Sequence, residues 1–346
     1  MALFGRSRVT AGLDIGSGFV KLVVIDHAKS EPEIVQIATS PLVPDAIVEG
    51  EVMDPVLVAE TVRSVVESVG GLKRPKVAAA VGGHDVIIKK IQMDRMSDTD
   101  AREVIRWEAE QHVPFDMENV QLDFQILDPG HDGPQMSVLL VAAKRELIEN
   151  RISLLADAGV KVAMIDVDAF ALHNAFERNY PAALQGLVAL VNVGHETTNL
   201  DLLQDGTPVL VRDLPFGSRR LREALQREKG FTAEQAEEVV QGRGDMSALS
   251  GFVADRADEL AVGIERAVAF AATQSGGTDL GRVFMSGGGS RIPGMVEALG
   301  TRLGVRTEMA NPFERVAIRP EVLQSVPVEE VAPMLMLSVG LGLRRR

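Results

Sequence analysis

The sequence predicts an α/β protein in which two similar lobes face each other across a cleft. The first observation is a repeat: residues 13–24 and 191–202 each contain an apolar strand, a short turn and a second strand, the pattern of a hairpin. The second is that each hairpin is followed further along the chain by an apolar strand that runs into glycines, over residues 77–83 and 283–289. Helical patterns alternate with these strands, so we expect mixed sheets covered by helices.

Composition limits the size and the class of the protein. The chain has 346 residues, of which 46% are hydrophobic, so it is neither disordered nor a small disulfide-stapled domain. At about 100–200 residues per domain, this length predicts roughly two domains. The 49 acidic and 36 basic residues give a net charge of −13, and only 4% of residues are aromatic, which argues against nucleic acid as a partner.

Cysteine and histidine usage excludes further classes of site. The chain has no cysteine, which rules out disulfides, thiol nucleophiles and thiolate metal sites and fits a reducing cytoplasm. The six histidines are scattered without an HxxxH pair, so a zinc site is not predicted. We expect His84, His112, His173 and His195 to be structural.

Neither a secretory signal nor a membrane span is predicted. Residues 1–12 lack the apolar core of a signal peptide. The longest apolar segment, 331–343, is shorter than the roughly 18 residues that a span requires. Because it also contains Pro333, Gly340 and Gly342, we expect a buried C-terminal helix rather than a membrane anchor.

Several elements between the repeated parts can be predicted from their ends. Residues 97–113 form a helical pattern that Ser97 can cap and Pro114 ends. Residues 120–127 and 136–142 predict a strand pair. The remaining predictions are a helix at 146–158 that closes at Gly159, a helix at 218–229 that ends at Gly230, a helix through Gln241 that opens with a capping box of Thr232 and Gln235, a turn or mobile loop at 242–250, a long helix at 251–273 and a helix around 295–303.

The hairpin turns have the composition of a phosphate site. Glycine and small hydroxyl residues leave backbone N–H groups accessible to an anion, and two facing turns can clamp a polyphosphate. Asp14 stands where a carboxylate can order the water shell of Mg²⁺, and Lys21 can reach a phosphate. Ser17, Thr197 and Thr198 offer hydroxyl donors. Each turn taken alone is more often a plain hairpin, and it is the pair in matching order that favours a phosphate site.

Two other segments are candidates for the rest of the site. The loop 287–290 follows a predicted buried strand and precedes a helix, so it suits a nucleoside, although it can also be a simple strand-to-helix turn. Asp166 and Asp168 stand at the junction of the predicted lobes. Either carboxylate can orient a water toward a phosphate, or can cap a helix that begins at Ala169.

These features carry a resemblance to a known superfamily. The two hairpins, the helix that contains Ala236-Glu237-Glu238 and the loop 286–290 (SGGGS) resemble the nucleotide-binding elements of actin-like ATPases. Two segments are more specific: residues 107–115 (WEAEQHVPF) and 311–316 (NPFERV) resemble the PilM family of type IV pilus assembly proteins, which is related to the cell-division protein FtsA. The resemblance covers essentially the whole chain.

The resemblance implies an actin-like ATPase fold of two duplicated lobes around a nucleotide cleft, with an FtsA-type inserted subdomain. The implied organisation is a first-lobe core at 1–88 (1A), the inserted subdomain at 89–162 (1C), an interlobe junction helix at 163–186 that is part of 1A, a second lobe at 187–320 with subdomain 2B inserted at about 215–275, and a C-terminal helix at 321–346 that returns to the first lobe.

The same resemblance implies ATP and Mg²⁺ in the cleft. Asp14 would bind Mg²⁺ through water, Glu237 would hold the ribose, and Asp168 is the candidate catalytic residue. The phosphate contacts carry over to Asp14, Gly16, Ser17, Lys21, Gly194, Thr197 and Thr198, and the adenosine loop to Gly287, Gly288, Ser290 and Arg291.

Two departures from the superfamily pattern bear on hydrolysis. Asn192 begins the second hairpin where the superfamily usually has Asp, and Val240 stands where relatives often have Lys beside the nucleotide. An amide supplies no negative charge to Mg²⁺, and a valine donates no hydrogen bond. We therefore expect nucleotide binding with weak or absent ATP hydrolysis.

The PilM resemblance also implies partners. PilM-like proteins are adaptors that bind the short N-terminal cytoplasmic segment of the inner-membrane protein PilN, in a groove between the first lobe and the inserted subdomain. The strand pair at 120–142, with Trp107 and Phe115 nearby, offers such a groove, unless Trp107 packs against its own subdomain. Contacts with pilus motor ATPases and other platform proteins, a role in twitching motility and a cytoplasmic place peripheral to the inner membrane follow from the same resemblance.

Two alternative functions remain at this point. An FtsA-like polymerising ATPase would share the core, but FtsA carries a C-terminal amphipathic helix after a linker, and we expect none here after the buried helix. A small-molecule kinase of the same superfamily needs a substrate pocket with a positioned base. The inserted segment shows no constellation of Asp, His and Arg that would supply one.

Overall fold

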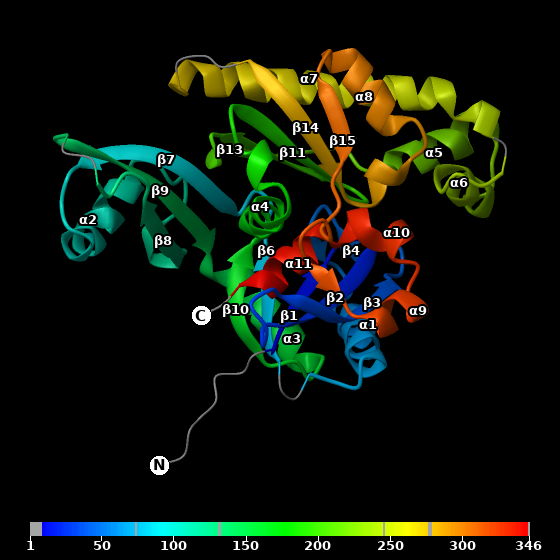
Figure 1. Cartoon of the computed structure of the whole chain (residues 1–346), viewed down its shortest axis with the longest axis horizontal. Helices are drawn as coiled ribbons and strands as arrows, with labels where there is room; N and C mark the ends of the chain where they lie inside the picture. The colour runs from blue at the N-terminus through cyan, green and yellow to red at the C-terminus, as the bar shows by residue number, and fades with distance from the viewer. Residues whose placement is uncertain (1–8, 73–74, 131–132, 245, 276–278, 345–346) are drawn as a thin grey trace.

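The computed structural model describes residues 9–72, 75–130, 133–244, 246–275 and 279–344, which form two large lobes and a smaller subdomain (Figure 1). Residues 1–8 lie outside the described residues, as do Arg345 and Arg346. The prediction that residues 1–12 form no secretory signal therefore falls largely outside the described part of the chain. Each lobe is built on a mixed sheet, and the subdomain has a sheet of its own.

The first lobe contains a six-stranded sheet with the order β10-β6-β1-β2-β3-β16. The first three strands along the chain, β1, β2 and β3, form an antiparallel meander, and the predicted turn at 16–18 joins β1 to β2. β6 pairs in parallel with β1, and β10 pairs in parallel with β6. The strands of this lobe are β1 (Val9–Ile15), β2 (Phe19–Asp26), β3 (Glu33–Pro41), β6 (Lys76–Val81), β10 (Val162–Val167), β16 (Ala317–Ile318) and the short hairpin of β4 (Ile47–Val48) and β5 (Glu51–Val52).

Helices cover both faces of this sheet. α1 (Pro55–Ser68) and α3 (Arg145–Asp157) pack on one face, and α4 (Asp168–Asn179) and α11 (Met336–Leu343) on the other. The segment 145–162 was expected in the inserted subdomain, but its Leu154 and Leu155 lie in the core of the first lobe. The reason is that an amphipathic helix pattern does not specify which sheet the helix covers.

The second lobe repeats the plan with a five-stranded sheet of order β13-β12-β11-β14-β15. Its helices gather on one face around a buried apolar cluster. The predicted capping box of Thr232 and Gln235 is present, and Gly230 ends α5 in the left-handed region at φ +69°. The elements are β11 (Leu187–Val193), β12 (Thr198–Gln204), β13 (Thr207–Leu214), β14 (Leu280–Ser286), β15 (Arg306–Met309), α5 (Ser218–Lys229), α6 (Ala233–Val240), α7 (Ser250–Ser275) and α8 (Met295–Leu303).

The second lobe also departs from the expected boundaries. β16 pairs with β3 of the first lobe, so the chain returns to the first lobe before residue 321. The loop predicted at 242–250 contains Asp245, which lies outside the described residues, and a single 3-10 turn at Met246–Ala248.

The two lobes share a hydrophobic core around α4, which lies between the two sheets (Figure 1). Ala171 and Leu172 of α4 pack with the first-lobe sheet, while Phe176 reaches Phe284 of β14 in the second. The rings of Phe176 and Phe284 meet edge to face with centroids 4.7 Å apart.

The inserted subdomain is a three-stranded sheet of order β7-β9-β8 with α2 on one face. Ser97 caps α2 by accepting from the backbone N–H of Asp100, as predicted. The helix ends at Glu110, before the predicted Val113. The elements are β7 (Val86–Asp94), α2 (Asp98–Glu110), β8 (Val120–Ile126) and β9 (Gln135–Lys144).

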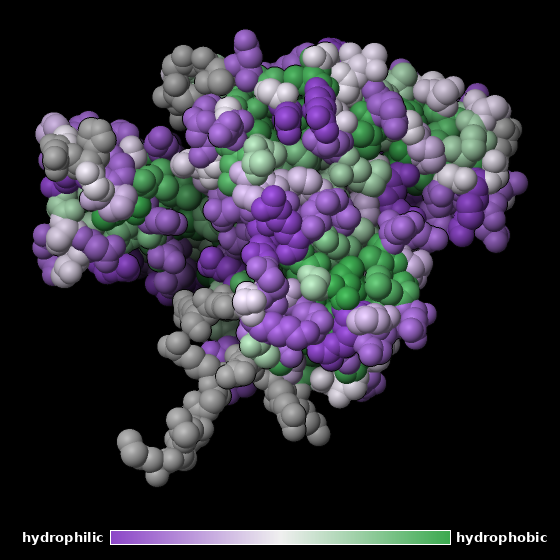
Figure 2. All heavy atoms as spheres, in the orientation of Figure 1, coloured by the Kyte–Doolittle hydropathy of each residue, from purple (hydrophilic) through white to green (hydrophobic). Residues whose placement is uncertain are grey.

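The apolar C-terminal segment is buried in the first lobe, as predicted. Gly12 and Gly340 allow this packing, because a Cβ on Gly340 would lie 1.7 Å from the carbonyl oxygen of Ala171 and one on Gly12 would lie 1.9 Å from that of Ser338. The preceding elements are α9 (Pro320–Ser325), α10 (Val328–Val331) and a 3-10 turn at Ala332–Leu335. On the face shown in Figure 2, hydrophobic residues gather over the first lobe between α9 and α10.

None of the helices within the described ranges has the length and apolar character that a bilayer crossing requires.

Candidate functional site

A cleft of about 710 Å³ lies between the two lobes, and both hairpin turns line it. The turns face each other as predicted, since a Cβ on Gly18 of the first would lie 3.0 Å from the Cβ of His195 in the second. The predicted site residues that line the cleft are Asp14, Gly16, Ser17, Lys21, Asp168, Gly194, Thr197, Glu237, Gly287, Gly288 and Arg291.

Two predicted hydroxyls do not line the cleft. Thr198 is fully buried, and its Oγ1 donates to the carbonyl of Phe216 at 2.8 Å. Ser290 is 1% exposed, and its Oγ donates to the carbonyl of Gly287 at 2.7 Å. Both hydroxyls stabilise the loops that carry them, so neither is placed to contact a phosphate or a nucleoside directly.

Asp14 and Lys21 form an ion pair at the base of the first turn. The two residues are cross-strand partners of β1 and β2, and Lys21 Nζ lies 2.5 Å from Asp14 Oδ2. Both side chains are mostly buried, at 8% and 14% exposure. Within the described part of the chain, no three His, Asp or Glu side chains are arranged to hold a metal ion by themselves.

Asp168 opens α4, and its carboxylate lies close to Gly82, directly after β6. The approach depends on Gly82, where a Cβ would lie 2.3 Å from Asp168 Oδ2. Burial raises the pKa of Asp168 to about 7, the charge of Asp14 adds to the increase, and Arg151 opposes it. α4 begins at Asp168 itself after Val167, without a side-chain cap, so the alternative that Asp168 caps the helix is wrong.

Asp166 has a different environment from Asp168 and does not line the cleft. It is 6% exposed, and its Oδ2 lies 2.8 Å from Nε of Arg344 in the C-terminal segment. Burial raises the pKa of Asp166 despite that arginine. Of the two carboxylates considered for a water-orienting role, only Asp168 faces the cleft.

Asn192 is held by hydrogen bonds inside the second-lobe sheet. Its Nδ2 donates to Asn199 Oδ1 at 3.0 Å, and its Oδ1 accepts from Ser286 Oγ at 3.2 Å. These partners come from β12 and β14, which flank β11. An amide suits this position because it donates to one neighbour and accepts from the other.

The nucleoside end of the cleft lies beside α6 and the glycine loop after β14. Gly287 adopts φ +81°, and a Cβ there would lie 2.3 Å from the carbonyl oxygen of Val193, so the loop requires glycine. Glu237 accepts hydrogen bonds from Arg222 and Gln241. Val240 is 7% exposed and packs in the second-lobe core.

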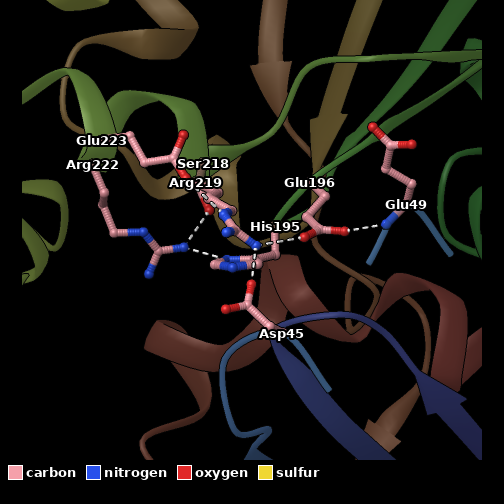
Figure 3. A network of polar contacts seen from close by, with 8 residues as sticks. All are labelled: Asp45, Glu49, His195, Glu196, Ser218, Arg219, Arg222 and Glu223. Carbon is pink, nitrogen blue, oxygen red and sulfur yellow. Dashed lines mark hydrogen bonds and ion pairs between the residues drawn. The ribbon is translucent and has the colours of Figure 1, made fainter. Parts of the chain in front are cut away.

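An ionic network joins the two lobes at the mouth of the cleft (Figure 3). Arg219 of α5 pairs with Asp45 of the first lobe at 2.7 Å and with Glu196 of the second at 2.9 Å. Glu196 also accepts from the backbone N–H of Glu49 at 2.6 Å. The first-lobe loop is held in an unusual conformation, since Asp45 and Glu49 have φ of +63° and +51°.

Sequence reasoning missed this network and the position of His195 in the cleft. His195 was expected to be structural, but it lines the cleft and contacts Arg222. The available signal was the basic start of α5, SRRLR at residues 218–222. The cationic residues that line the cleft are Lys21, Arg151, Arg219, Arg220, Arg222 and Arg291.

Trp107 lies on the outer surface of the inserted subdomain. It is 71% exposed, so the alternative that it packs against its own subdomain is wrong. Ala101, Ile105 and Ala109 form the buried face of α2, and helical periodicity places Trp107 on the opposite face, away from the strand pair. Phe115 is partly buried, with Lys144 Nζ 4.9 Å from its ring centroid.

The model of one protein family, described as "Type IV pilus assembly protein PilM", matches residues 12–346. The chain belongs to the PilM family. A solved structure of a PilM-PilN type IV pilus biogenesis complex is 28% identical to this PilM-family chain, covers 97% of this chain and 98% of that one, and superposes with a TM-score of 0.84.

More distant structures share the fold of the PilM family. The ethanolamine utilization protein EutJ from Carboxydothermus hydrogenoformans is 18% identical, with 97% and 89% of the two chains covered and a TM-score of 0.58. MreB5 of Spiroplasma citri bound to AMPPNP is 10% identical, with 97% and 95% covered and a TM-score of 0.53. The fold is therefore the actin-like ATPase fold, as the sequence predicted.

Proposed function

We propose that this PilM-family protein is a nucleotide-binding adaptor of the type IV pilus assembly platform, and that it binds the N-terminal cytoplasmic segment of PilN. The similarity to the PilM-PilN complex over nearly the whole of both chains is the observation that carries the proposal. Such an adaptor acts in the cytoplasm and is held at the inner membrane through its partner.

The groove for the PilN segment lies between the first lobe and the inserted subdomain. β10 and β8 are edge strands of their sheets, and edge strands offer unpaired backbone groups to an extended peptide. Asp123 of β8 is close enough to Asp166 of β10 for its charge to raise the pKa of Asp166, which supports placing the two edges side by side. Asp123 is exposed and alternates with the partly buried Leu122 and Phe124.

The cleft suits ATP with Mg²⁺. Lys21 and the two turns would bind the phosphates, and Asp14 would hold Mg²⁺ through its water shell, which this ion gives up reluctantly. Glu237 holds the ribose, and Gly287, Gly288 and Arg291 contact the adenosine. Thr198 and Ser290 support these loops from behind without contacting the nucleotide.

Hydrolysis is slow or absent in this proposal. Asn192 supplies no charge to Mg²⁺ and is committed to Asn199 and Ser286. With a pKa of about 7, Asp168 is about half protonated at neutral pH, which weakens it as an acceptor for the proton of an attacking water. The bound nucleotide then holds the lobes together and supports the surface that binds PilN.

The first test is isothermal titration of the purified protein with MgATP and with a synthetic PilN N-terminal peptide, followed by a phosphate-release assay. We expect binding of both and negligible phosphate release. Rapid release would indicate an enzyme or an active filament former, and no peptide binding would contradict the adaptor function.

A matched pair of variants tests the groove. Asp123→Lys changes the charge at the edge of β8, and Glu103→Lys makes the same change on the exposed face of α2. We expect Asp123→Lys to abolish peptide binding without altering MgATP affinity, and Glu103→Lys to alter neither. Unchanged peptide binding by Asp123→Lys would show that the groove lies elsewhere.

A further inference from the structure

His195 lies in the second of the two turns that would clamp the phosphates, and its side chain faces the first. Its side chain packs against Gly18 of the first turn, where a Cβ would lie 3.2 Å from Cγ and 3.4 Å from Nδ1 of the ring. Because His195 itself belongs to the second turn, its imidazole lies in the cleft where the two turns meet.

The contact with Arg222 fixes the tautomer of His195. Nη2 of Arg222 contacts Nδ1 of the ring, and the same nitrogen donates to Ser218 Oγ at 3.1 Å. A guanidinium only donates hydrogen bonds, so Nδ1 must accept and the proton of the neutral imidazole must reside on Nε2.

The ring is neutral at physiological pH. Burial lowers the pKa of His195 to about 4, and the charges of Arg222 and Arg219 contribute to the decrease. Nε2, on the far side of the ring from Arg222, has no hydrogen-bond partner in the described part of the chain. His195 therefore offers one free N–H donor that does not titrate between about pH 5 and 8.

We propose that His195 donates a hydrogen bond from Nε2 to a distal phosphate of the bound nucleotide, beyond the α-phosphate. The inference rests on the proposed nucleotide binding and adds a side-chain donor to the backbone groups of the turns. Arg222 is the positioning residue, since it orients the ring and also pairs with Glu237. The guanidinium of Arg222 thereby connects His195 at the phosphate end of the site with Glu237 at the ribose end.

The proposal predicts an effect that depends on the number of phosphates. His195→Phe keeps the ring volume and removes the donor, whereas His195→Gln places an amide N–H near the position of Nε2. We expect His195→Phe to weaken ATP and ADP binding about tenfold, the loss of one hydrogen bond to a charged group, and to leave AMP binding unchanged. His195→Gln restores most of the affinity, and His112→Phe on the inserted subdomain serves as the control.

The outcomes separate this inference from the function on which it rests. If the wild type binds ADP and ATP but His195→Phe changes affinity for all three nucleotides equally, or for none, this inference is wrong and the proposed function stands. If the wild type binds no nucleotide, the nucleotide part of the proposed function fails and this inference fails with it.

A second measurement needs no variant. ¹⁵N NMR of the histidine rings in the wild-type protein reports the protonation of each ring nitrogen. We expect an unprotonated Nδ1 and a protonated Nε2 for His195 from pH 5.5 to 8, with a shift of the Nε2 proton when ADP is added. A charged ring at pH 7, or a proton on Nδ1, would overturn the inference even if the His195 variants failed to fold.

Discussion

Lys21 Nζ and Asp14 Oδ2 are 2.5 Å apart, so the lysine predicted to bind phosphate and the carboxylate predicted to bind Mg²⁺ are partners of each other. Without nucleotide, each charge compensates the other in a site that is largely screened from solvent. A nucleotide with Mg²⁺ would give each group a new partner of opposite charge, a phosphate for Lys21 and the metal ion for Asp14. Neither charge would then be left unpaired.

The ion pair predicts a non-additive effect on stability. Lys21→Met leaves Asp14 unpaired and should lower the free energy of unfolding by about 3 kcal/mol, because an uncompensated buried charge is costly. Adding Asp14→Asn should recover much of that loss. Urea unfolding of the single and double variants gives the coupling energy. A double variant as unstable as the sum of the two single variants would show that the pair is not coupled.

Asp168 predicts a pH dependence of stability. Its folded pKa of about 7 lies above the ordinary value of 3.8, so the folded protein holds this proton more tightly than the unfolded chain does between these two pH values. Stability should therefore fall as pH rises from 4 to 7, by at most about 4 kcal/mol from this group. Asp168→Asn should flatten that part of the profile. A fall as steep in the variant as in the wild type would exclude Asp168 as the cause.

The ionic network at the mouth of the cleft predicts local protection of the first-lobe loop. Asp45→Asn removes a contact of Arg219 that crosses between the lobes, while Glu223→Gln removes one within the second lobe. Hydrogen exchange over residues 42–52 should accelerate in the first variant and not in the second. Global stability should change by less than about 1 kcal/mol in both, because exposed ion pairs contribute little.

Gly340 predicts a packing defect. A Cβ at this position would collide with the backbone of Ala171, so Gly340→Ala must push α11 away from α4 and should cost about 3 kcal/mol. Gly251→Ala on α7 is the control, since a Cβ there meets nothing within 4 Å, and it should be neutral or slightly stabilising. Equal melting temperatures for the two variants would contradict the tight packing of α11.

Patterns with a strong steric or periodic cause were predictable from the sequence. The sequence predicted the hairpins, the glycine loop, the capping box and the buried C-terminal helix. Few other structures explain a glycine where two backbones approach closely, a hydroxyl residue at the start of a helix, or a continuous apolar segment. The cleft followed from the repeat, since two equal hairpins in equal order imply two facing turns.

The missed features depend on long-range contacts that a local pattern does not encode. Thr198 was predicted as a phosphate donor beside Thr197, but it is buried at the start of β12 and its hydroxyl donates to the carbonyl of Phe216 in its own lobe. The leucines of α3 match the first-lobe core and the inserted subdomain equally well. His195 looked structural because its partner, Arg222, is 27 residues away.

The apolar cluster around α4 has a consequence for how this protein melts. Because Phe176 and Phe284 belong to one continuous core that includes both large sheets, neither lobe retains a complete core when the other unfolds. The subdomain formed by β7, β8, β9 and α2 has a separate cluster of its own. Calorimetry should therefore resolve one cooperative transition for both lobes together, while the subdomain shares no such core with either lobe and can unfold in a transition of its own.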